Sequence, residues 1–231
     1  MPNWQPVPKP AEIAEQRLLE AILGGHFAVD TRLPGERDLA AQLGVTRPTL
    51  REALQRLARD GWLDIQHGKP TRVRDYWREG SLAVLATLAS SAAGQAPDFV
   101  AHLLEVRALL APAYTLQACQ AAGDEVRAFL ENTAGLDDNP SAFARFDWQL
   151  HRLLTQRAAN PIFRLLLNSF EALYVSMAER YFAFDQCRQH SRAFYAALRD
   201  CTPDQAEALA RAIMQESLSL WVQMTGGKER A

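Results

Sequence analysis

The chain is poor in cysteine and carries no strong excess of charge of either sign. Its 231 residues include only Cys119, Cys187 and Cys201, without a CxxC pair, which argues against a disulfide framework or a thiolate zinc site. This usage fits a reducing cytoplasm, and the N-terminus MPNWQPVPKP lacks the apolar core of an export signal. A net charge of -2 argues against bulk-charge coating of nucleic acid. The composition predicts an ordinary globular protein of the cytoplasm.

Long apolar runs and catalytic signatures are also missing. The uncharged stretch 80–97 is as long as a short membrane span, but it contains serine, threonine, glycine and glutamine and is rich in alanine. We therefore expect a packing helix of small residues there, and no membrane partner. The chain has no GxSxG elbow, no Walker loop, no GxGxxG after a strand and no HExxH. Its five histidines form no familiar catalytic spacing with cysteine or serine, so an enzyme is not expected.

The first 75 residues combine short amphipathic helices with a hairpin. One helix stops at Gly24-Gly25, and a second is expected over 36–43. Thr46 is a good N-cap for a third helix, whose predicted buried face is Leu50, Ala53, Leu54, Leu57 and Ala58. Residues 62–66 and 71–75 then resemble two strands, and their candidate inward positions are Leu63, Ile65 and Val73. This order predicts a winged helix-turn-helix.

The third helix and the hairpin carry a local excess of positive charge. Residues 47–74 hold seven arginines and lysines against three acids, a net +4, so the rest of the chain sums to -6. Arg47 and Arg51 lie one turn apart on the face opposite the apolar stripe, where a recognition helix places arginine against guanine. The short basic tip 67–69 can approach a phosphate backbone or enter the minor groove. Together these features predict DNA binding.

Helical periodicity takes over after the hairpin and continues to the end of the chain. Breakers divide this part into about six or seven helices, and they fall at Pro97, Gly123, 137–140, 160–161 and 202–203. Pro112 is expected to kink one long helix. The predicted fold is mainly α with a small β-wing. Its expected parts are a winged helix-turn-helix over 1–75, a linker over 76–80 and an antiparallel all-α bundle over 81–231.

Some side chains on these helices are candidates for binding a ligand. Apolar residues over 163–181 form one stripe, which predicts a single long helix with Tyr174 and Tyr181 two turns apart. Arg107 falls in the middle of another apolar stripe, where a guanidinium needs an anion. That anion is either an internal carboxylate or a bound ligand, and the pattern leaves both open. Two further candidates share a face of the last helix, Ser217 and Trp221.

The run PGERDLAAQLGVTRPTLREALQRLARDGWLDIQHGKPTRV closely resembles the winged-helix domain of the GntR family of bacterial regulators. Within it, LQRLARDGWL and IQHGKPT resemble the fatty-acid-responsive FadR type. The resemblance implies DNA contacts at Arg37, Thr46, Arg47, Thr49, Arg51, His67, Gly68 and Lys69. Pro48 stands where a threonine is common, so one hydroxyl contact to the DNA backbone is expected to be absent.

A second resemblance to the FadR type covers HLLEVRALL, ALYVSMAERYF and ESLSLW in the helical part. It implies a domain that binds long-chain fatty acyl-CoA as effector, needs no cofactor, and uses Arg107, Tyr174, Tyr181, Ser217 and Trp221. Met214 replaces a glycine of the FadR type, and the lysine of TGGKER comes two residues later, so the expected acyl tunnel is narrower or shorter. The expected protein is a homodimeric repressor or activator of fatty acid metabolism that leaves a palindromic operator when acyl-CoA binds.

Two alternatives belong to other classes of binding or chemistry. Related helical domains hold a metal through one Asp and three His and thereby bind small carboxylates, and Asp147 and His151 match the first pair. Ser191 and Ser217 occupy the other two positions, and His190 projects about 100° away. We therefore expect an Asp147–His151 hydrogen bond or ion pair in place of a metal. The other alternative, an enzyme acting on acyl-CoA, requires turnover rather than stoichiometric binding.

Overall fold

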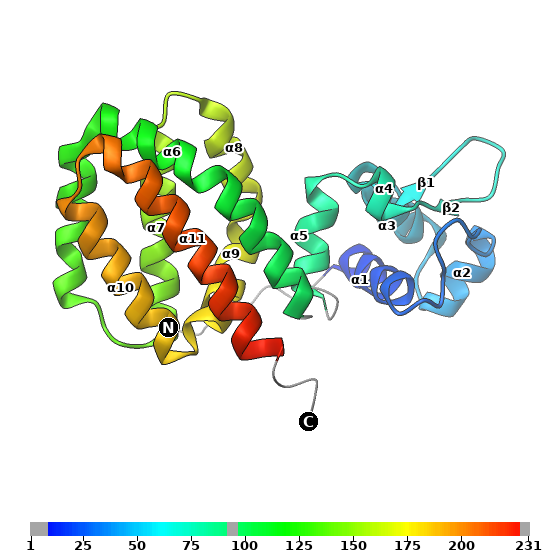
Figure 1. Ribbon diagram of the computed structural model, residues 1–231. Coiled ribbons are helices and arrows are strands. Elements are labelled where there is room, and N and C mark those ends of the chain that lie inside the picture. Colours follow the sequence, from blue (N-terminus) through cyan, green and yellow to red (C-terminus); the bar gives the residue numbers. More distant parts are fainter. Residues whose placement is uncertain (1–8, 92–96, 227–231) are drawn as a thin grey trace, which may run out of the picture. The chain divides into compact units, whose positions relative to one another are not determined.

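The computed structural model describes residues 9–91 and 97–226 and divides the chain into two compact units, 1–88 and 89–231 (Figure 1). The described residues are mainly helical and include one two-stranded antiparallel sheet, which confirms the predicted fold class. Each unit has a core of its own, and we describe them in turn.

Three helices form the body of the N-terminal unit. They are α1 (Pro10–Leu23), α2 (Glu36–Leu43) and α3 (Arg47–Asp60), and both α1 and α2 pack against α3. The buried stripe of α3 comprises Leu50, Ala53, Leu54 and Leu57, as predicted, while Ala58 is only half-buried. Gly44 and Gly61 end α2 and α3 with φ values of 68° and 103°, a left-handed conformation that glycine adopts without strain. These local signals explain why the helix bounds follow from the sequence.

The wing is a short hairpin of β1 (Leu63–Asp64) and β2 (Arg72–Val73), in which Leu63 pairs with Val73. Both of these side chains are fully buried. The prediction that Ile65 also points inward is wrong, because Ile65 is 44% exposed. The ladder ends at Asp64, so the alternation of buried and exposed positions does not extend to the next residues.

Two short helices follow the wing, α4 (Tyr76–Glu79) and α5 (Leu82–Ser90). Val84 and Leu88 of α5 are buried, and the side chain of Val84 lies against Gly61 at the end of α3. The hydroxyl of Ser81 donates a hydrogen bond to the carbonyl of Asp60. The N-terminal unit therefore includes residues that follow the expected linker 76–80. The expected packing helix over 80–97 is described up to Ser91, and residues 92–96 lie outside the described part of the chain.

Six α-helices form the described part of the C-terminal unit after residue 96. They are α6 (Pro97–Glu131), α7 (Pro140–Arg157), α8 (Pro161–Ser169), α9 (Glu171–Phe182), α10 (Asp185–Asp200) and α11 (Pro203–Gly226), with a 3-10 turn at Asn132–Gly135. Helix α6 packs against α7, α10 and α11, and α7 packs against α9 (Figure 1). By length and composition alone α6 could cross a membrane, but here it forms part of a helical core.

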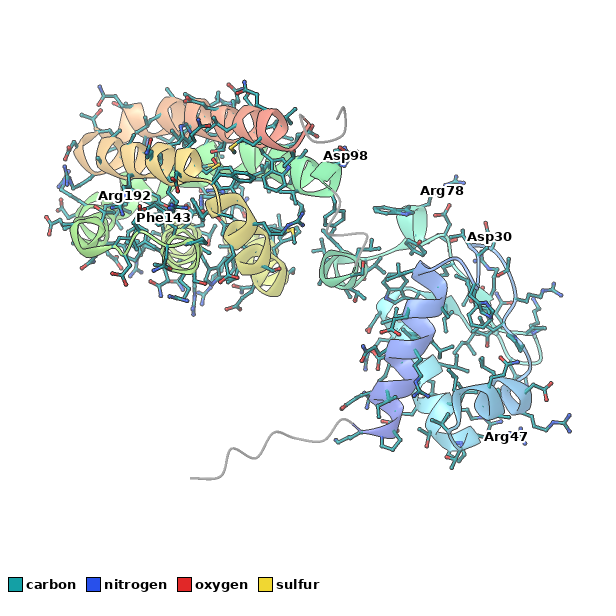
Figure 2. All side chains as sticks on the ribbon, turned by 90° about the horizontal axis from the view of Figure 1, so that it is seen from below. Asp30, Arg47, Arg78, Asp98, Phe143 and Arg192 are labelled. Atoms are coloured by element: carbon teal, nitrogen blue, oxygen red, sulfur yellow. The ribbon has the colours of Figure 1, made fainter. Side chains whose placement is uncertain are left out.

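Aromatic side chains fill the centre of this unit. Phe143, Phe182 and Tyr195 are almost completely buried, and the rings of Phe143 and Phe182 lie 5.4 Å apart. The Arg192 guanidinium lies 4.8 Å from the centre of the Phe143 ring (Figure 2). These contacts hold α7, α9 and α10 together.

One break in the helices differs from the sequence predictions, and another agrees with them. The prediction of one helix over 163–181 is wrong, because Phe170 (φ −102°, ψ 2°) separates α8 from α9. Within α6 the non-helical residue is Ala122, beside the predicted breaker Gly123, whereas Pro112 lies inside the helix. The break at Phe170 divides the apolar stripe between α8 and α9, and residues of both helices line one pocket.

Candidate functional site

The N-terminal end of α3 presents two arginines to solvent. The Thr46 hydroxyl accepts a hydrogen bond from the Thr49 backbone N–H at 3.3 Å and lies 2.8 Å from the Thr49 hydroxyl, which caps the helix. Because the apolar stripe faces α1 and α2, the side chains of Arg47 and Arg51 remain 58% exposed. Figure 2 shows Arg47 at the outer edge of this unit.

Glu36, the first residue of α2, binds both arginines. Its Oε2 atom accepts a hydrogen bond from Arg51 Nε at 2.7 Å and lies 3.9 Å from Arg47 Nη2. The adjacent Arg37 is 85% exposed and pairs with Asp38 at 3.2 Å. Glu36 therefore fixes the orientation of Arg51 while the far edge of its guanidinium stays accessible. The sequence analysis missed this role of Glu36.

A groove joins the start of α2, the exposed face of α3 and the wing. Six of the eight predicted DNA-contacting residues line it, namely Arg37, Arg47, Arg51, His67, Gly68 and Lys69. Thr46 and Thr49 lie at the adjacent end of α3 and are not part of its lining. Gly68 has a φ of 73° at the wing tip, and Lys69 Nζ donates to Gln66 Oε1 at 2.8 Å. The groove is therefore positively charged, accessible and continuous from helix to wing.

The helical unit contains an apolar pocket between α6, α8 and α9. Helix α6 contributes Val100, Leu103, Leu104, Val106, Arg107, Leu110 and Tyr114. The other wall consists of Phe163, Leu166, Leu167, Phe170, Tyr174, Met177, Ala178, Tyr181 and Phe182. The stripe that predicted one continuous core helix is thus divided over two helices that both face this space. The structure places the candidates Arg107, Tyr174 and Tyr181 on its wall.

Arg107 has an internal carboxylate as its partner. Its Nη2 atom lies 2.9 Å from Asp147 Oδ2 and 2.6 Å from His151 Nε2, and its guanidinium is 5.6 Å from the centre of the Tyr174 ring. Asp147 also accepts hydrogen bonds from the hydroxyls of Tyr174 (2.6 Å) and Tyr195 (2.9 Å). The sequence left open whether Arg107 pairs with an internal carboxylate or with a bound ligand. The structure shows an internal carboxylate, Asp147. The spacing of the sequence gave no signal for Tyr195.

The charges of this cluster follow from its burial. Burial alone would raise the pKa of Asp147, but the charge of Arg107 and the hydrogen bonds from the two tyrosine hydroxyls hold this pKa below its ordinary value. Burial, together with the positive charge of Arg107, lowers the pKa of His151 to about 3. At neutral pH the cluster therefore contains one guanidinium, one carboxylate and a neutral imidazole.

Asp147 and His151 are not joined by a direct hydrogen bond. Asp147 Oδ1 and His151 Nε2 are 3.8 Å apart, and both side chains instead bind Arg107. The expected ion pair would need a charged imidazole, which its lowered pKa prevents. His190 Nε2 lies 3.2 Å from the Ile213 carbonyl. Within 9–91 and 97–226, no three His, Cys, Asp or Glu side chains are grouped so as to hold a metal ion.

The two candidates on α11 lie behind the pocket wall. Ser217 and Trp221 are buried but are not among the pocket-lining residues. Ser217 Oγ donates to the Ile213 carbonyl at 2.9 Å, and the Arg180 guanidinium lies 5.8 Å from the Trp221 ring. The Tyr181 hydroxyl is buried beside Ser217 and Cys187, but neither of them, nor any other side chain in the described part of the chain, meets hydrogen-bond geometry with it. Ser217 can therefore affect the pocket only through neighbours such as Tyr181.

Comparisons with known proteins define the class of the molecule. The family model for bacterial regulatory proteins of the gntR family matches residues 10–73, and the model for the FadR C-terminal domain matches residues 74–227. This chain therefore belongs to the GntR family of DNA-binding bacterial regulators, and within it to the members with a FadR C-terminal domain.

Curated relatives match nearly the whole chain. The fatty acid metabolism regulator protein of Edwardsiella ictaluri is 37% identical over 225 residues, covering 96% of this chain and 94% of the relative. The protein of that name from Yersinia enterocolitica is 38% identical, with coverages of 94% and 92%. A solved structure of Lar, a regulator of the Listeria monocytogenes agr system, has a TM-score of 0.59 at 16% identity and covers 95% and 99% of the two chains. That likeness concerns the fold alone.

Proposed function

We propose that this DNA-binding regulator of fatty acid metabolism binds a palindromic operator as a homodimer in the cytoplasm and releases it when long-chain fatty acyl-CoA enters the helical pocket. The observation that carries the effector assignment is the composition of that pocket. Its walls on α6, α8 and α9 are apolar, and a buried guanidinium lies among them. An aliphatic chain fits such walls because each buried methylene contributes about 0.8 kcal/mol.

The basic groove supports the DNA part of the proposal. Arg47 and Arg51 line this groove together with His67 and Lys69 of the wing tip. On this proposal the two arginines reach base edges in the major groove, and the wing tip contacts the backbone or the minor groove. One recognition helix reads only a few base pairs. A two-fold symmetric dimer doubles the interface on a palindromic site, which supports the homodimer.

The effector must favour one arrangement of the protein over another. A ligand shifts an equilibrium only by its difference in affinity for the two states, and coupling of about 1 to 3 kcal/mol is typical. The pocket is suited to this task because it lies between helices that a ligand can push apart or draw together. Tight binding of acyl-CoA alone would leave the operator occupied.

The Arg107 cluster argues against sensing of a small carboxylate through a metal. Asp147 and His151 already share a cation, the guanidinium of Arg107. A metal at this position would have to displace that guanidinium and repel it. We therefore retain acyl-CoA as the proposed effector.

Titration of the protein–operator complex tests the proposal. We expect long-chain acyl-CoA to release the operator in a saturable manner, and free CoA to have no effect. The acyl-CoA should be recovered intact, since the proposed role is stoichiometric binding. Release by a small dicarboxylate together with a divalent metal, and not by acyl-CoA, would refute the effector assignment but leave the DNA-binding assignment standing.

A further inference from the structure

The pocket wall carries a hydrogen-bond donor that no acceptor uses in the described part of the chain. Arg107 Nε is buried, has no hydrogen-bond partner, and belongs to a residue that lines the pocket. An unpaired donor in an apolar space is costly, so it points to an acceptor atom that a ligand supplies. The proton positions of the neighbouring His151 identify a second donor.

The tautomer of His151 follows from its contact with Arg107. A guanidinium keeps its protons and only donates, so His151 Nε2, 2.6 Å from Arg107 Nη2, must accept. Because the low pKa of His151 keeps the ring neutral, its single proton lies on Nδ1. Nδ1 therefore donates to the Tyr114 hydroxyl oxygen at 2.7 Å. The hydroxyl proton of Tyr114 must point away from His151.

Tyr114 and Arg107 are two turns apart on α6, and both line the pocket, whereas His151 does not. Both carboxylate oxygens of the nearby Asp147 already accept hydrogen bonds from other side chains. Asp147 Oδ2 accepts from Arg107 and Tyr174, and Oδ1 accepts from Tyr195. The Tyr114 O–H and the Arg107 Nε–H are therefore two donors of the Asp147 cluster on this wall, in addition to the Tyr181 hydroxyl further along α9.

We propose that the pocket receives the acyl carbonyl oxygen of its ligand on the Tyr114 hydroxyl and the Arg107 Nε–H, and so selects acyl over alkyl compounds of equal length. A carbonyl oxygen only accepts and has two lone pairs, which matches a pair of donors. The inference rests on the proposed function, because it assumes a fatty acyl ligand in this pocket. It adds the atom by which that ligand is recognised. The carboxylate of a free fatty acid offers the same acceptor chemistry.

Calorimetric titration of the full-length protein with matched ligands tests this assignment. The ligands are a long-chain acyl-CoA, the S-alkyl-CoA thioether in which a methylene replaces the carbonyl, and the free fatty acid. We expect the acyl-CoA to bind tenfold or more tightly than the thioether. Tyr114→Phe should abolish this difference by lowering the affinity for acyl-CoA but not for the thioether, because the ring and its contacts with His151 and Phe163 remain.

Tyr195→Phe is the matched control, since it removes a hydroxyl from the same buried cluster but not from the pocket wall. It should leave the ratio of the two affinities unchanged. Equal affinity of acyl-CoA and thioether for the wild type overturns the inference even if a variant fails to fold. An equal loss for both ligands in Tyr114→Phe also overturns it, because the tyrosine then acts by packing.

The free fatty acid separates this inference from the proposed function. Binding of the acid but not of acyl-CoA, with sensitivity to Tyr114→Phe, would support the donors and refute acyl-CoA as effector. Release of the operator by acyl-CoA that binds no more tightly than the thioether would support the proposed function. It would refute recognition of the carbonyl oxygen by Tyr114 and Arg107. Binding of none of the three ligands would refute both.

Discussion

Arg107 is the residue whose removal is expected to cost the helical unit most. The side chains of Arg107 and Asp147 are 16% and 1% exposed, so deleting the guanidinium leaves a buried carboxylate without a cation. We expect Arg107→Met to lower the free energy of unfolding by about 3 to 5 kcal/mol. Adding Asp147→Asn to that variant should recover much of the loss. Denaturant unfolding of the two single variants and the double variant measures the coupling, and strictly additive effects would contradict it.

His151 makes stability depend on pH. Its pKa is about 3 in the folded protein, well below the ordinary value of 6.5, so the unfolded chain binds a proton more readily. The stabilisation is complete above pH 6.5 and declines as the pH falls towards 3. Between pH 7 and pH 5 the loss from this group is about 2 kcal/mol.

Unfolding of wild type and His151→Asn across this range tests the pH dependence. The variant is expected to be less stable at pH 7, because it loses contacts with Arg107 and Tyr114, but to change less with pH. Parallel pH profiles of the two proteins would show that His151 is not the group responsible.

Helix α3 and the wing are expected to contribute differently to DNA binding. Arg51→Ala removes a candidate base contact and should cost about 1 to 3 kcal/mol on the operator, with weaker discrimination at particular base pairs. Lys69→Ala should weaken binding to all DNA sequences alike. The number of counterions released on binding, which the salt dependence of the affinity measures, should fall by about one. Binding to operator and random DNA at several salt concentrations distinguishes them. Equal losses on both DNAs in Arg51→Ala would remove its role in sequence reading.

The elements that the sequence predicts best are those with local end signals. The bounds of α2 and the start of α3 agree with prediction because Gly44 and Thr46 determine them within a single turn. The break at Phe170 has no such signal, since the chain there contains neither glycine nor proline and the apolar period continues across it. The prediction that Ile65 is buried was wrong for a similar reason, because a two-residue strand is too short for buried and exposed positions to alternate along it.

The binding sites show the same division between local and distant information. The exposure of Arg47 and Arg51 could be predicted from their helix face alone, because their neighbours in the sequence define it. The partner of Arg107 could not be assigned, since Asp147 lies 40 residues away and any acid in the helical part was eligible. Glu36 is 15 residues from Arg51, and only the packing of α2 against α3 brings them together.

At the scale of the whole molecule, family and packing divide the chain at different places. The FadR C-terminal model begins at residue 74, whereas the compact N-terminal unit extends to Leu88. Residues 74–88, with α4 and most of α5, therefore match the family of the C-terminal domain but pack as part of the N-terminal unit. They form the covalent link through which the helical unit is attached to the DNA-binding unit. The predicted boundaries at 75 and 81 fall within this link.

The whole protein is expected to function without a bound metal. Only Asp147 and His151 remain of a four-residue ligand set, and Arg107 binds both. We expect elemental analysis of the purified protein to find no stoichiometric zinc or nickel. A chelator should change neither its melting temperature nor its response to acyl-CoA. Stoichiometric metal whose removal abolishes the response would restore carboxylate sensing as the function.

The guanidinium at the centre of this cluster has a consequence for the bacterium that makes the protein. The positive charge of Arg107 is a covalent part of the polypeptide, so neither a chelator nor a shortage of metal removes it. The buried charge of Asp147 is therefore balanced within the chain, without a metal ion. If acyl-CoA is the effector, as proposed, its signal does not depend on the supply of metal.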